Sequence, residues 1–407
     1  MKSFEIPDFY RSHLISKLKS FRKLQDPRKK DFTPTVLDYG NMEIMLPRHF
    51  GFCYGVENAI EICYKALNDH PGKRVYLLSQ MIHNQEVNSD LQDRGILFLQ
   101  DTQGNELLSF DILTSNDVVV IPAFGTTVEM LARLKRKGVD VQAYNTTCPF
   151  VEKVWKRSNK LGDQEFTVVI HGKPKHEETR ATFSHSNESA KSIVIKNMEE
   201  AKLLGSFIKG EKSKTEFYQV FGKFCSEGFD PEQHLKKLGV VNQTTMLATE
   251  TQAIADHLKL CIIDKFGEEH YKDHFADTRD TLCYATNDNQ QATYGMLEEG
   301  ADIAIVVGGY NSSNTSHLVE LCEEKMPTFF IKNEEEIESL ELINHFDWRN
   351  NKYKTSSSWL PLQDKPRIIV TSGASCPDSV VERVIEKILF FGQAEKDTKS
   401  VLQAAIS

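Results

Sequence analysis

Three cysteines stand where a thiolate could bind a metal: Cys53 in GFCYG, Cys148 in NTTCP and Cys283 in TLCYAT. Each follows a short loop and precedes a segment with helical periodicity, where backbone N–H groups and the helix dipole favour a thiolate. They are 95 and 135 residues apart (148 minus 53, 283 minus 148), which excludes a local finger or ribbon and requires a three-lobed fold. Three thiolates suit an iron–sulfur cluster with one open iron, whereas a closed structural site normally has four ligands.

The other five cysteines have a simpler interpretation as ordinary thiols. Cys63, Cys261 and Cys322 continue apolar stripes at helical spacing and are expected in the core. Cys225 lies in a mixed segment and is expected at the surface, whereas Cys376 is ambiguous. The sequence has no CxxC pair and no secretory signal, which fits a reduced cytosolic protein.

Hydroxyl and amide side chains gather in two loops that follow predicted strands. Residues 311–314 read NSSN, with Ser312, Ser313 and Asn314, and precede a helix predicted from about Ser316. Residues 372–377 repeat the arrangement and include Ser375. A helix N-cap would explain one Ser or Asn, but four such residues in a row exceed what a cap requires. The free N–H groups, hydroxyls and amides of the two loops predict a phosphate site.

Two histidines and a glutamate lie in other polar loops. His83 and His176 could pair with an anion when protonated, although a lone loop histidine is usually only solvated. Glu178 is a candidate proton donor, Glu177 is expected to face solvent, and residues 243–245 (QTT) add hydroxyls. The chain has no DDxxD cluster, which argues against magnesium-clamped diphosphate chemistry.

The elements that must position these residues form an α/β pattern. Short β-branched runs alternate with amphipathic helices, which predicts parallel sheets, and ligands collect at the C-terminal ends of such strands. Neither GxGxxG nor GxxxxGK[ST] follows any strand, so no dinucleotide site or P-loop is indicated. The strand runs are 118–121, 167–170, 303–307 and 368–370.

Composition limits the possible classes of protein. The 407 residues suggest two or three domains. Hydrophobic content of 40% and charged content of 26% indicate a globular protein, and the net charge of −9 argues against a general nucleic-acid binder. No run of eighteen apolar residues exists, so no membrane partner is expected. The N-terminus has no apolar signal region and is too acidic for a transit peptide, which makes the cytoplasm the default location.

Three segments fall outside the repeating pattern. Residues 1–43 carry an apolar stripe and are expected to be a docked arm, with the basic run 28–30 more a solvated face than a functional patch. Residues 186–240 are largely polar and resemble an insertion around one or two peripheral helices. Residues 393–407 are expected to form a polar, mobile tail.

In their order along the chain, these motifs resemble the 4-hydroxy-3-methylbut-2-enyl diphosphate reductase family, also called IspH or LytB, over about residues 44–390. The separate interpretation of each motif does not explain why all of them occur in the family's order. The resemblance implies a trefoil of three pseudo-equivalent α/β domains with small, mostly parallel sheets around a central 4Fe–4S cluster, with Cys53, Cys148 and Cys283 as ligands. The motifs are GFCYGV (51–56), HN (83–84), TCP (147–149), HEE (176–178), QTT (243–245), CYAT (283–286), NSSN (311–314) and GAS (373–375).

The resemblance also implies domain boundaries. The first domain would span 54–148, the second 149–278 with the insertion 186–240, and the third would join 44–53 to 279–392. The arm 1–43 and the tail 393–407 would flank them.

The implied activity is the reductive dehydroxylation of 4-hydroxy-3-methylbut-2-enyl diphosphate to isopentenyl and dimethylallyl diphosphates, the last step of the methylerythritol phosphate isoprenoid pathway. Glu178 and Thr244 would deliver protons, the open iron would act as a Lewis acid, and ferredoxin or flavodoxin would donate electrons. The residues implied to bind the diphosphate substrate are His83, His176, Thr244, Ser312, Ser313, Asn314 and Ser375.

One departure from the family pattern stands out. Many bacterial members carry a histidine in an Ala-His-Gly loop where this chain has Phe124 between Ala123 and Gly125, so one diphosphate contact is missing. That loop and the arm are more similar to the plant and cyanobacterial branch, which favours ferredoxin over flavodoxin.

Two other functions fit part of the pattern. A non-enzymatic iron–sulfur redox sensor on the same scaffold would need neither the proton donor nor the phosphate loops, so their presence counts against it. A three-Cys zinc hydrolase would be colourless and contain zinc.

Overall fold

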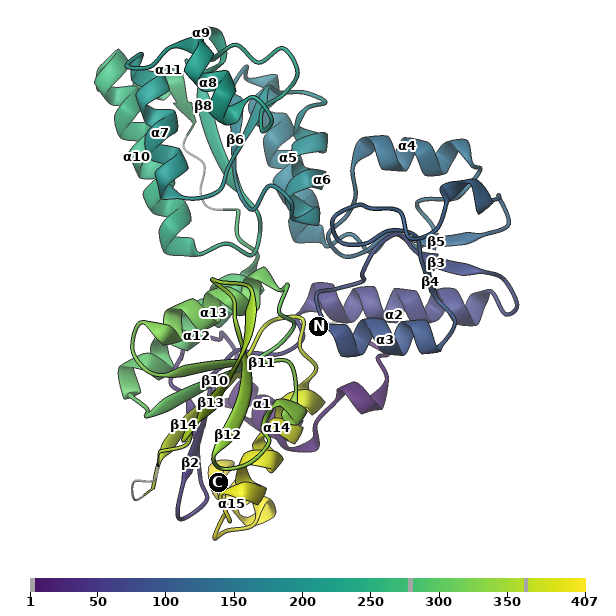
Figure 1. The fold of residues 1–407 in the computed structure, drawn as a ribbon, viewed down its shortest axis with the longest axis vertical. Coiled ribbons are helices and arrows are strands. Elements are labelled where there is room, and N and C mark those ends of the chain that lie inside the picture. Colours follow the sequence, from purple (N-terminus) through teal and green to yellow (C-terminus); the bar gives the residue numbers. More distant parts are fainter. Residues whose placement is uncertain (1–3, 277–280, 362–364) are drawn as a thin grey trace. The chain divides into compact units, whose positions relative to one another are not determined.

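The computed structural model describes residues 4–276, 281–361 and 365–407 (Figure 1). Contacts divide the chain into two compact units: unit 1 is Met1–Glu57, His83–Val87 and Tyr284–Ser407, and unit 2 is Asn58–Ile82 and Asn88–Cys283. The three-domain boundaries stay a prediction, and the one at 278/279 lies outside the described residues. Among the helices that the structure describes, none combines the length and apolarity needed to cross a membrane.

A five-stranded sheet with the order β1-β2-β14-β10-β11 forms the centre of unit 1. All neighbours are parallel except β1, which is antiparallel to β2. Because β2 pairs with β14, the segment before Cys53 packs with the chain after Cys283, as the family resemblance implies. The strands are β1 (Thr35–Asp38), β2 (Glu43–Leu46), β10 (Ile303–Val307), β11 (Thr328–Ile331) and β14 (Arg367–Ser372), with a separate antiparallel hairpin of β12 (Leu342–Asp347) and β13 (Lys352–Ser357).

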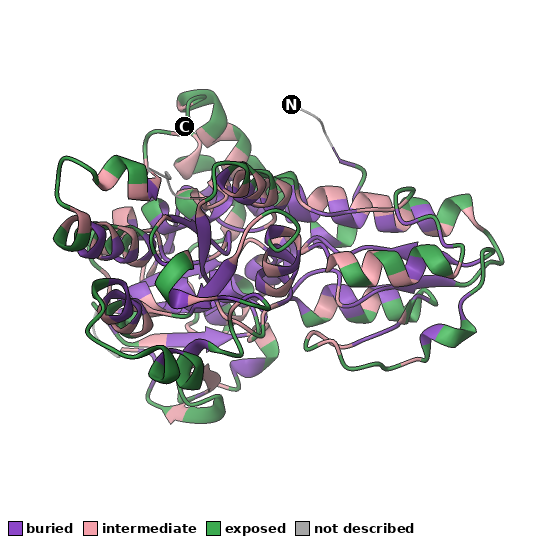
Figure 2. Ribbon diagram, turned by 90° about the horizontal axis from the view of Figure 1, so that it is seen from above, coloured by how far each residue is buried: buried purple, intermediate pink, exposed green. Residues whose placement is uncertain are grey.

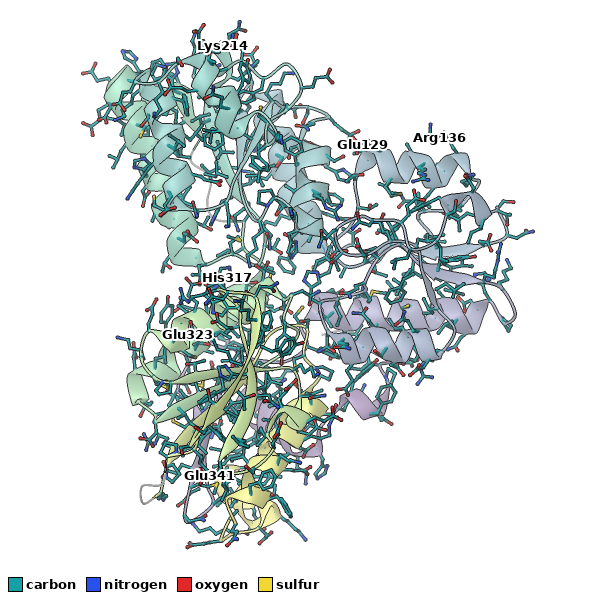
Figure 3. All side chains as sticks on the ribbon, in the orientation of Figure 1. Glu129, Arg136, Lys214, His317, Glu323 and Glu341 are labelled. Atoms are coloured by element: carbon teal, nitrogen blue, oxygen red, sulfur yellow. The ribbon has the colours of Figure 1, made fainter. Side chains whose placement is uncertain are left out.

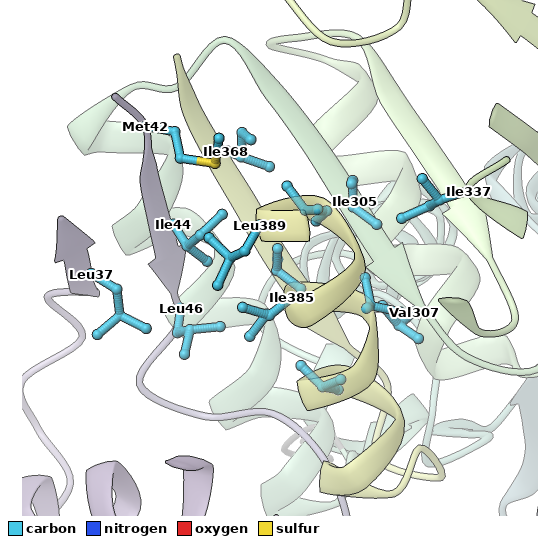
Figure 4. Packing of buried hydrophobic residues seen from close by; sticks show 14 of the residues in the cluster. Leu37, Met42, Ile44, Leu46, Ile305, Val307, Ile337, Ile368, Ile385 and Leu389 are labelled. Atoms are coloured by element: carbon cyan, nitrogen blue, oxygen red, sulfur yellow. The ribbon is translucent and has the colours of Figure 1, made fainter. Parts of the chain in front are cut away.

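Both faces of this sheet are covered by helices, which explains its continuous apolar runs. Side chains alternate between the faces: Ile305 and Val307 join one apolar cluster with α1, α14 and α15 (Figure 4), and Ala304 and Val306 join another with α12 and α13. These helices are α1 (His13–Gln25), α12 (Tyr284–Glu299), α13 (Ser313–Glu323), α14 (Asp378–Phe391) and α15 (Thr398–Ala405).

The N-terminal arm is docked, as its apolar stripe predicted. Ser12 caps α1 by accepting the N–H of Ile15 at 2.9 Å. Leu14, Ile15 and Leu18 are buried in the same cluster as α14. The arm therefore completes the core of unit 1.

The prediction of a mobile C-terminal tail was wrong. Asp397 caps α15 by accepting the N–H of Ser400 at 3.0 Å. Val401 and Leu402 are buried in the cluster that contains α1. These two side chains, with the backbone hydrogen bonds from Glu395 and Lys396 to the Tyr39 carbonyl, dock a segment that is otherwise polar.

Unit 2 contains two parallel sheets, with the orders β4-β3-β5 and β7-β6-β8-β9. Together with the sheet of unit 1, they confirm the predicted α/β class with small, mostly parallel sheets. The strands are β3 (Val75–Leu77), β4 (Leu97–Phe98), β5 (Val118–Val120), β6 (Thr167–His171), β7 (Ser192–Ile195), β8 (Leu238–Asn242) and β9 (Phe275–Ala276).

The helices between β2 and α12 are α2 (Tyr54–Asp69), α3 (Gln85–Asp93), α4 (Val128–Arg136), α5 (Pro149–Asp163), α6 (Glu177–Ser186), α7 (Met198–Lys209), α8 (Lys214–Phe221), α9 (Pro231–His234), α10 (Ala248–Phe266) and α11 (Tyr271–His274). Most of them bury one face, but α6 has no exposed residue and α11 has no buried one. Figure 2 shows helices with exposed stripes and strands coloured mainly as buried. Short 3₁₀ turns occur at Asp8–Tyr10, Phe110–Ile112 and Glu334–Glu336.

The interpretation of residues 186–240 as a peripheral insertion was wrong in part. The expected helices exist as α7 and α8, but β7 pairs with β6 within the sheet, and α7 packs against α10. Ile193, Ile195 and Leu204 are fully buried in the shared core. The polar residues that suggested an insertion occupy the exposed faces of these elements.

Candidate active site

Each of the three singled-out cysteines directly precedes a helix, as its sequence context predicted. Cys53 precedes α2, Cys148 is the N-cap residue of α5, and Cys283 precedes α12. All three are half-buried, and none forms a disulfide. A loop-to-helix junction exposes backbone N–H groups near each sulfur, which is a suitable environment for a thiolate ligand.

The remaining cysteines are structural. Cys63, Cys261 and Cys322 are buried as expected, and Cys376 is fully buried as well, which settles its ambiguous assignment in favour of the core. Burial raises the pKa of Cys322 to about 12. Cys225, expected at the surface, is half-buried, because residues 222–226 fold against β7.

Cys148 lies in unit 2 near two other ionisable groups of the predicted site. Burial raises the pKa of its thiol to about 11, and the charges of Cys283 and Glu178 act in the same direction. Backbone N–H groups at the start of α5 oppose this shift without cancelling it. Cys148, Cys283 and Glu178 therefore belong to one electrostatic environment.

Glu178 is buried, with 1% of its surface exposed, and both carboxyl oxygens contact Thr244. One oxygen accepts the Thr244 N–H at 2.6 Å, and the other accepts the Thr244 hydroxyl at 3.0 Å. Burial raises the pKa of Glu178 to about 7, while the two hydrogen bonds from Thr244 lower it. A carboxyl with this pKa carries a transferable proton near neutral pH, as a general acid requires.

Thr244 also connects Glu178 to a cysteine. Its carbonyl accepts the N–H of Cys283 at 3.2 Å. The candidate proton donor and one candidate ligand are thus attached to the same residue.

Gln243 positions the loop that carries Thr244. It was not recognised as a site residue from the sequence. It is fully buried, and its side-chain oxygen accepts the Lys173 N–H at 3.1 Å and the Thr179 hydroxyl at 3.0 Å. These bonds attach the loop after β8 to the loop and helix that carry Glu178. The available signal was a polar amide directly after a strand that is buried along its whole length.

His176 is the N-cap residue of α6, and its Nδ1 accepts the N–H of Glu178 at 3.2 Å. The ring of Phe124 meets the His176 ring edge to face, with centroids 5.5 Å apart and planes at 85°. Ala123, beside Phe124, accepts the N–H of Cys148 at 2.9 Å. The phenylalanine that replaces the loop histidine thus supports the orientation of another histidine of the site.

The predicted exposure of Glu177 was wrong. Glu177 is buried and accepts the hydroxyl of Ser79 at 2.5 Å. The helix that carries it is further attached to α4 by the Ser184 hydroxyl, which donates to Glu129 at 2.8 Å (Figure 3 labels Glu129 on α4). Successive residues at the start of a buried helix both face protein, because α6 is packed on several sides.

In unit 1, the residues predicted to form a phosphate site lie at the start of α13. The helix begins at Ser313, three residues earlier than expected, and Ser312 caps it by accepting the Thr315 N–H at 3.2 Å. The buried Ser313 hydroxyl has no hydrogen-bond partner within the described residues. A buried hydroxyl without a partner at a helix N-terminus is what a bound anion would satisfy.

The loop of residues 372–377 and His83 lie beside the start of α13 and form one polar cluster with it. The Ser375 hydroxyl donates to the His83 carbonyl at 3.1 Å, and Asn314 accepts the Ala374 N–H at 2.9 Å. Gly309 lies so close to His83 that a Cβ there would stand 2.2 Å from its carbonyl oxygen, so this approach requires glycine.

Cys53 belongs to the same cluster, since its N–H donates to the carbonyl of Ala374 at 3.3 Å. Asn289 of α12 is a second positioning residue that the sequence did not reveal. It is buried, and its amide lies 3.5 Å from the Asn314 oxygen.

Each unit thus contains one group of the predicted residues. Unit 2 has Glu178 as a buried acid with two thiols nearby, and unit 1 has the polar cluster predicted to bind an anion, to which Cys53 is linked through its backbone N–H. Within the described ranges, no three His, Cys, Asp or Glu side chains are grouped as a metal site. The residues in unit 2 are Cys148, His176, Glu178, Thr244 and Cys283, and those in unit 1 are Cys53, His83, Ser312, Ser313, Asn314 and Ser375.

Comparison with known proteins gives a consistent result. The family model described as LytB protein matches residues 44–389. A 4-hydroxy-3-methylbut-2-enyl diphosphate reductase of Trichormus variabilis is 38% identical over 366 residues, covering 90% of this chain and 88% of the relative. The enzyme of the same name from Prochlorococcus marinus strain MIT 9301 is 37% identical over 385 residues, covering 94% of this chain and 92% of the relative. Both organisms are cyanobacteria, in agreement with the branch that the sequence indicated.

Two solved structures share the fold. One is (E)-4-hydroxy-3-methyl-but-2-enyl diphosphate reductase, described as the terminal enzyme of the non-mevalonate pathway, with a TM-score of 0.51, 23% identity, and coverage of 85% of this chain and 99% of that chain. The other is the E-1-hydroxy-2-methyl-but-2-enyl-4-diphosphate reductase from Plasmodium falciparum, with a TM-score of 0.60, 20% identity, and coverage of 85% and 87%.

Proposed function

The chain belongs to the LytB protein family, and on that premise we propose that it reduces 4-hydroxy-3-methylbut-2-enyl diphosphate to isopentenyl and dimethylallyl diphosphates. In this reaction two electrons and two protons break the allylic C–O bond, release water and place hydrogen on carbon. The observation that carries the proposal is Glu178: a buried carboxyl with a pKa of about 7, held through both oxygens by Thr244. A non-enzymatic redox sensor would have no use for such an acid.

The substrate diphosphate would be bound by the cradle at the start of α13 and by the two histidines. Ser312, Ser313 and Asn314 lie where the helix dipole favours negative charge, and Ser375 adds a hydroxyl from the neighbouring loop. The unpartnered Ser313 hydroxyl supports this role. His83, His176 and the Thr244 hydroxyl would supply further donors.

A 4Fe–4S cluster would be held by Cys53, Cys148 and Cys283. The donor chemistry fits, because all three are half-buried thiols outside any disulfide that directly precede helix N-termini. When bound, such a cluster supplies electrons and an open Lewis-acidic iron. Glu178, with Thr244 as its partner, would protonate the departing oxygen. That none of the eight cysteines forms a disulfide supports a reducing compartment such as the cytoplasm.

The decisive experiment is purification without oxygen, followed by iron, sulfide and zinc analysis and an assay with the diphosphate substrate. We expect a brown protein with about four irons per chain, as a cubane cluster requires. Cys53→Ser, Cys148→Ser and Cys283→Ser should each lose most of the iron, whereas the buried core thiols in Cys63→Ser and Cys322→Ser serve as matched controls that keep it. A colourless protein loaded with zinc would overturn the proposal.

A further inference from the structure

A cavity of about 220 Å³ opens in unit 1 beside Cys53, and four Lys and Arg side chains stand among its aromatic and polar lining. Its walls come from α1, from the segment that follows α1, from the loop before Cys53 and from the start of α12. None of these basic residues takes part in the site described above. The lining includes Lys19, Lys23, Lys29 and Arg48 on one side, and Cys53 and Tyr284 on the other.

The two inner cations of this cavity are already neutralised. The Lys19 ammonium lies 2.7 Å from a carboxyl oxygen of Asp378. The Arg48 guanidinium donates to the carbonyls of Arg22 and Asp26 at 3.3 and 3.2 Å, and lies 3.9 Å from the Asp26 carboxylate. Their fixed partners make them poor ligands for a small anion inside the cavity.

The two outer cations differ. Lys23 is exposed and Lys29 is half-buried, and within the described part of the chain neither forms an ion pair. The Lys29 ammonium lies 5.7 Å from the centre of the Tyr284 ring, and Asp288 is the one acid among the described lining residues. The rim of the cavity is therefore positive on a protein whose net charge is −9.

Resting on the proposed function, we propose that this basic rim is the docking surface for an acidic protein that carries one electron at a time. Each encounter would oxidise one reduced carrier and leave one electron on the enzyme, so two encounters supply one turnover. Because Cys53 lines the same cavity, a carrier docked there would lie next to a proposed cluster ligand. Electron transfer slows steeply with distance, so this position matters.

Charge explains why the rim is needed. An acidic carrier is repelled by a chain with a net charge of −9 unless a local positive patch directs the approach. Lysines outside ion pairs suit this purpose, because steering acts through the surface potential and does not need converging hydrogen bonds. From the sequence, the run 28–30 is expected to be a solvated face; the position of Lys29 in the cavity wall beside Cys53 changes that interpretation.

The test uses the cluster-loaded protein, an acidic plant-type [2Fe–2S] ferredoxin as carrier, and the variants Lys23→Glu, Lys29→Glu and the double variant. Lys17→Glu is the matched control, since Lys17 is exposed on α1 and does not line the cavity. Binding of the oxidised carrier, measured by titration calorimetry at low salt, should weaken by about tenfold or more in the double variant, with a smaller salt dependence. Lys17→Glu should change it little.

Turnover separates docking from chemistry. With reduced ferredoxin the double variant should be slower than wild type, whereas with reduced methyl viologen, a small cationic donor, it should not. Iron content and melting temperature show whether each variant folds. If the substitution at Lys29 prevents folding, Lys23→Glu alone tests the docking surface. Wild-type affinity in the double variant, or an equal loss in Lys17→Glu, would overturn the docking surface. A cluster-loaded wild type without reductase activity toward either donor would instead refute the proposed function.

Discussion

At the scale of single residues, the contact between Glu178 and Thr244 makes the proposed mechanism testable without disturbing the fold. Glu178→Gln keeps the size of the side chain and its bond from the Thr244 N–H, but has no acidic proton to transfer. We expect the reductase rate to fall by about a hundredfold or more, the usual scale for loss of a general acid. Iron content and substrate affinity should change little, because Glu178 belongs to neither the proposed ligands nor the diphosphate cradle.

Glu177→Gln is the matched control for that experiment. Glu177 is the preceding residue and is also buried, but its contact is with Ser79 rather than with Thr244. A rate loss in Glu177→Gln as large as in Glu178→Gln, or near-normal turnover of Glu178→Gln with an intact cluster, would remove Glu178 from the mechanism.

The same carboxyl predicts the pH dependence of the reaction. Burial raises the pKa of Glu178 to about 7, and the proton donor is the neutral form, which predominates below that pH. The value of kcat should therefore decline as the pH rises above about 7, approaching tenfold per pH unit. Measurement of kcat from pH 6 to 9 with an artificial donor would show this limb in wild type, and its persistence in Glu178→Gln would assign it to another group.

At the scale of elements, the start of α13 combines two roles in one residue. Ser312 is the helix cap and a proposed phosphate ligand, so Ser312→Ala should cost about 1 kcal/mol of stability. It should also weaken diphosphate binding by about 1 to 3 kcal/mol, because a hydrogen bond to a charged group is lost. Ser213→Ala removes the cap of α8 and should show the stability loss alone, measured by denaturation and by substrate titration.

Several elements could be predicted from the sequence because their signals are local. The helices after Cys53, Cys148 and Cys283 follow from loop residues at their starts, and the cluster around Asn314 follows from a run of hydrogen-bonding side chains after a buried strand. The burial of Glu177 could not be predicted, and that of Gln243 had only the signal of an amide directly after a buried strand, because both depend on packing between segments far apart in the chain. The same reason explains why β7 and α15 were assigned to peripheral segments.

At the scale of the whole molecule, the family match and the folded core do not have the same limits. The LytB family model ends at residue 389 and begins at residue 44, yet unit 1 buries side chains on both sides of that range. α15 packs against α1 and β1, so the two ends of the chain stabilise each other. Residues that supply none of the predicted catalytic groups are therefore part of the core that positions Cys53 and the phosphate cradle.

This arrangement predicts that unit 1 depends on its terminal helix. Leu402→Ala, in α15, should lower the stability of unit 1 by about 2 to 5 kcal/mol, the usual cost of removing a buried leucine side chain. Gln403→Ala is the control, because Gln403 is the next residue and is exposed. Hydrogen exchange of the β1 and β2 amides, followed by mass spectrometry, should accelerate in Leu402→Ala while the amides of β6 and β8 in unit 2 remain protected. Unchanged protection of β1 in this variant would show that α15 adds nothing to the core and that residues 393–407 are the free tail that their polarity suggests.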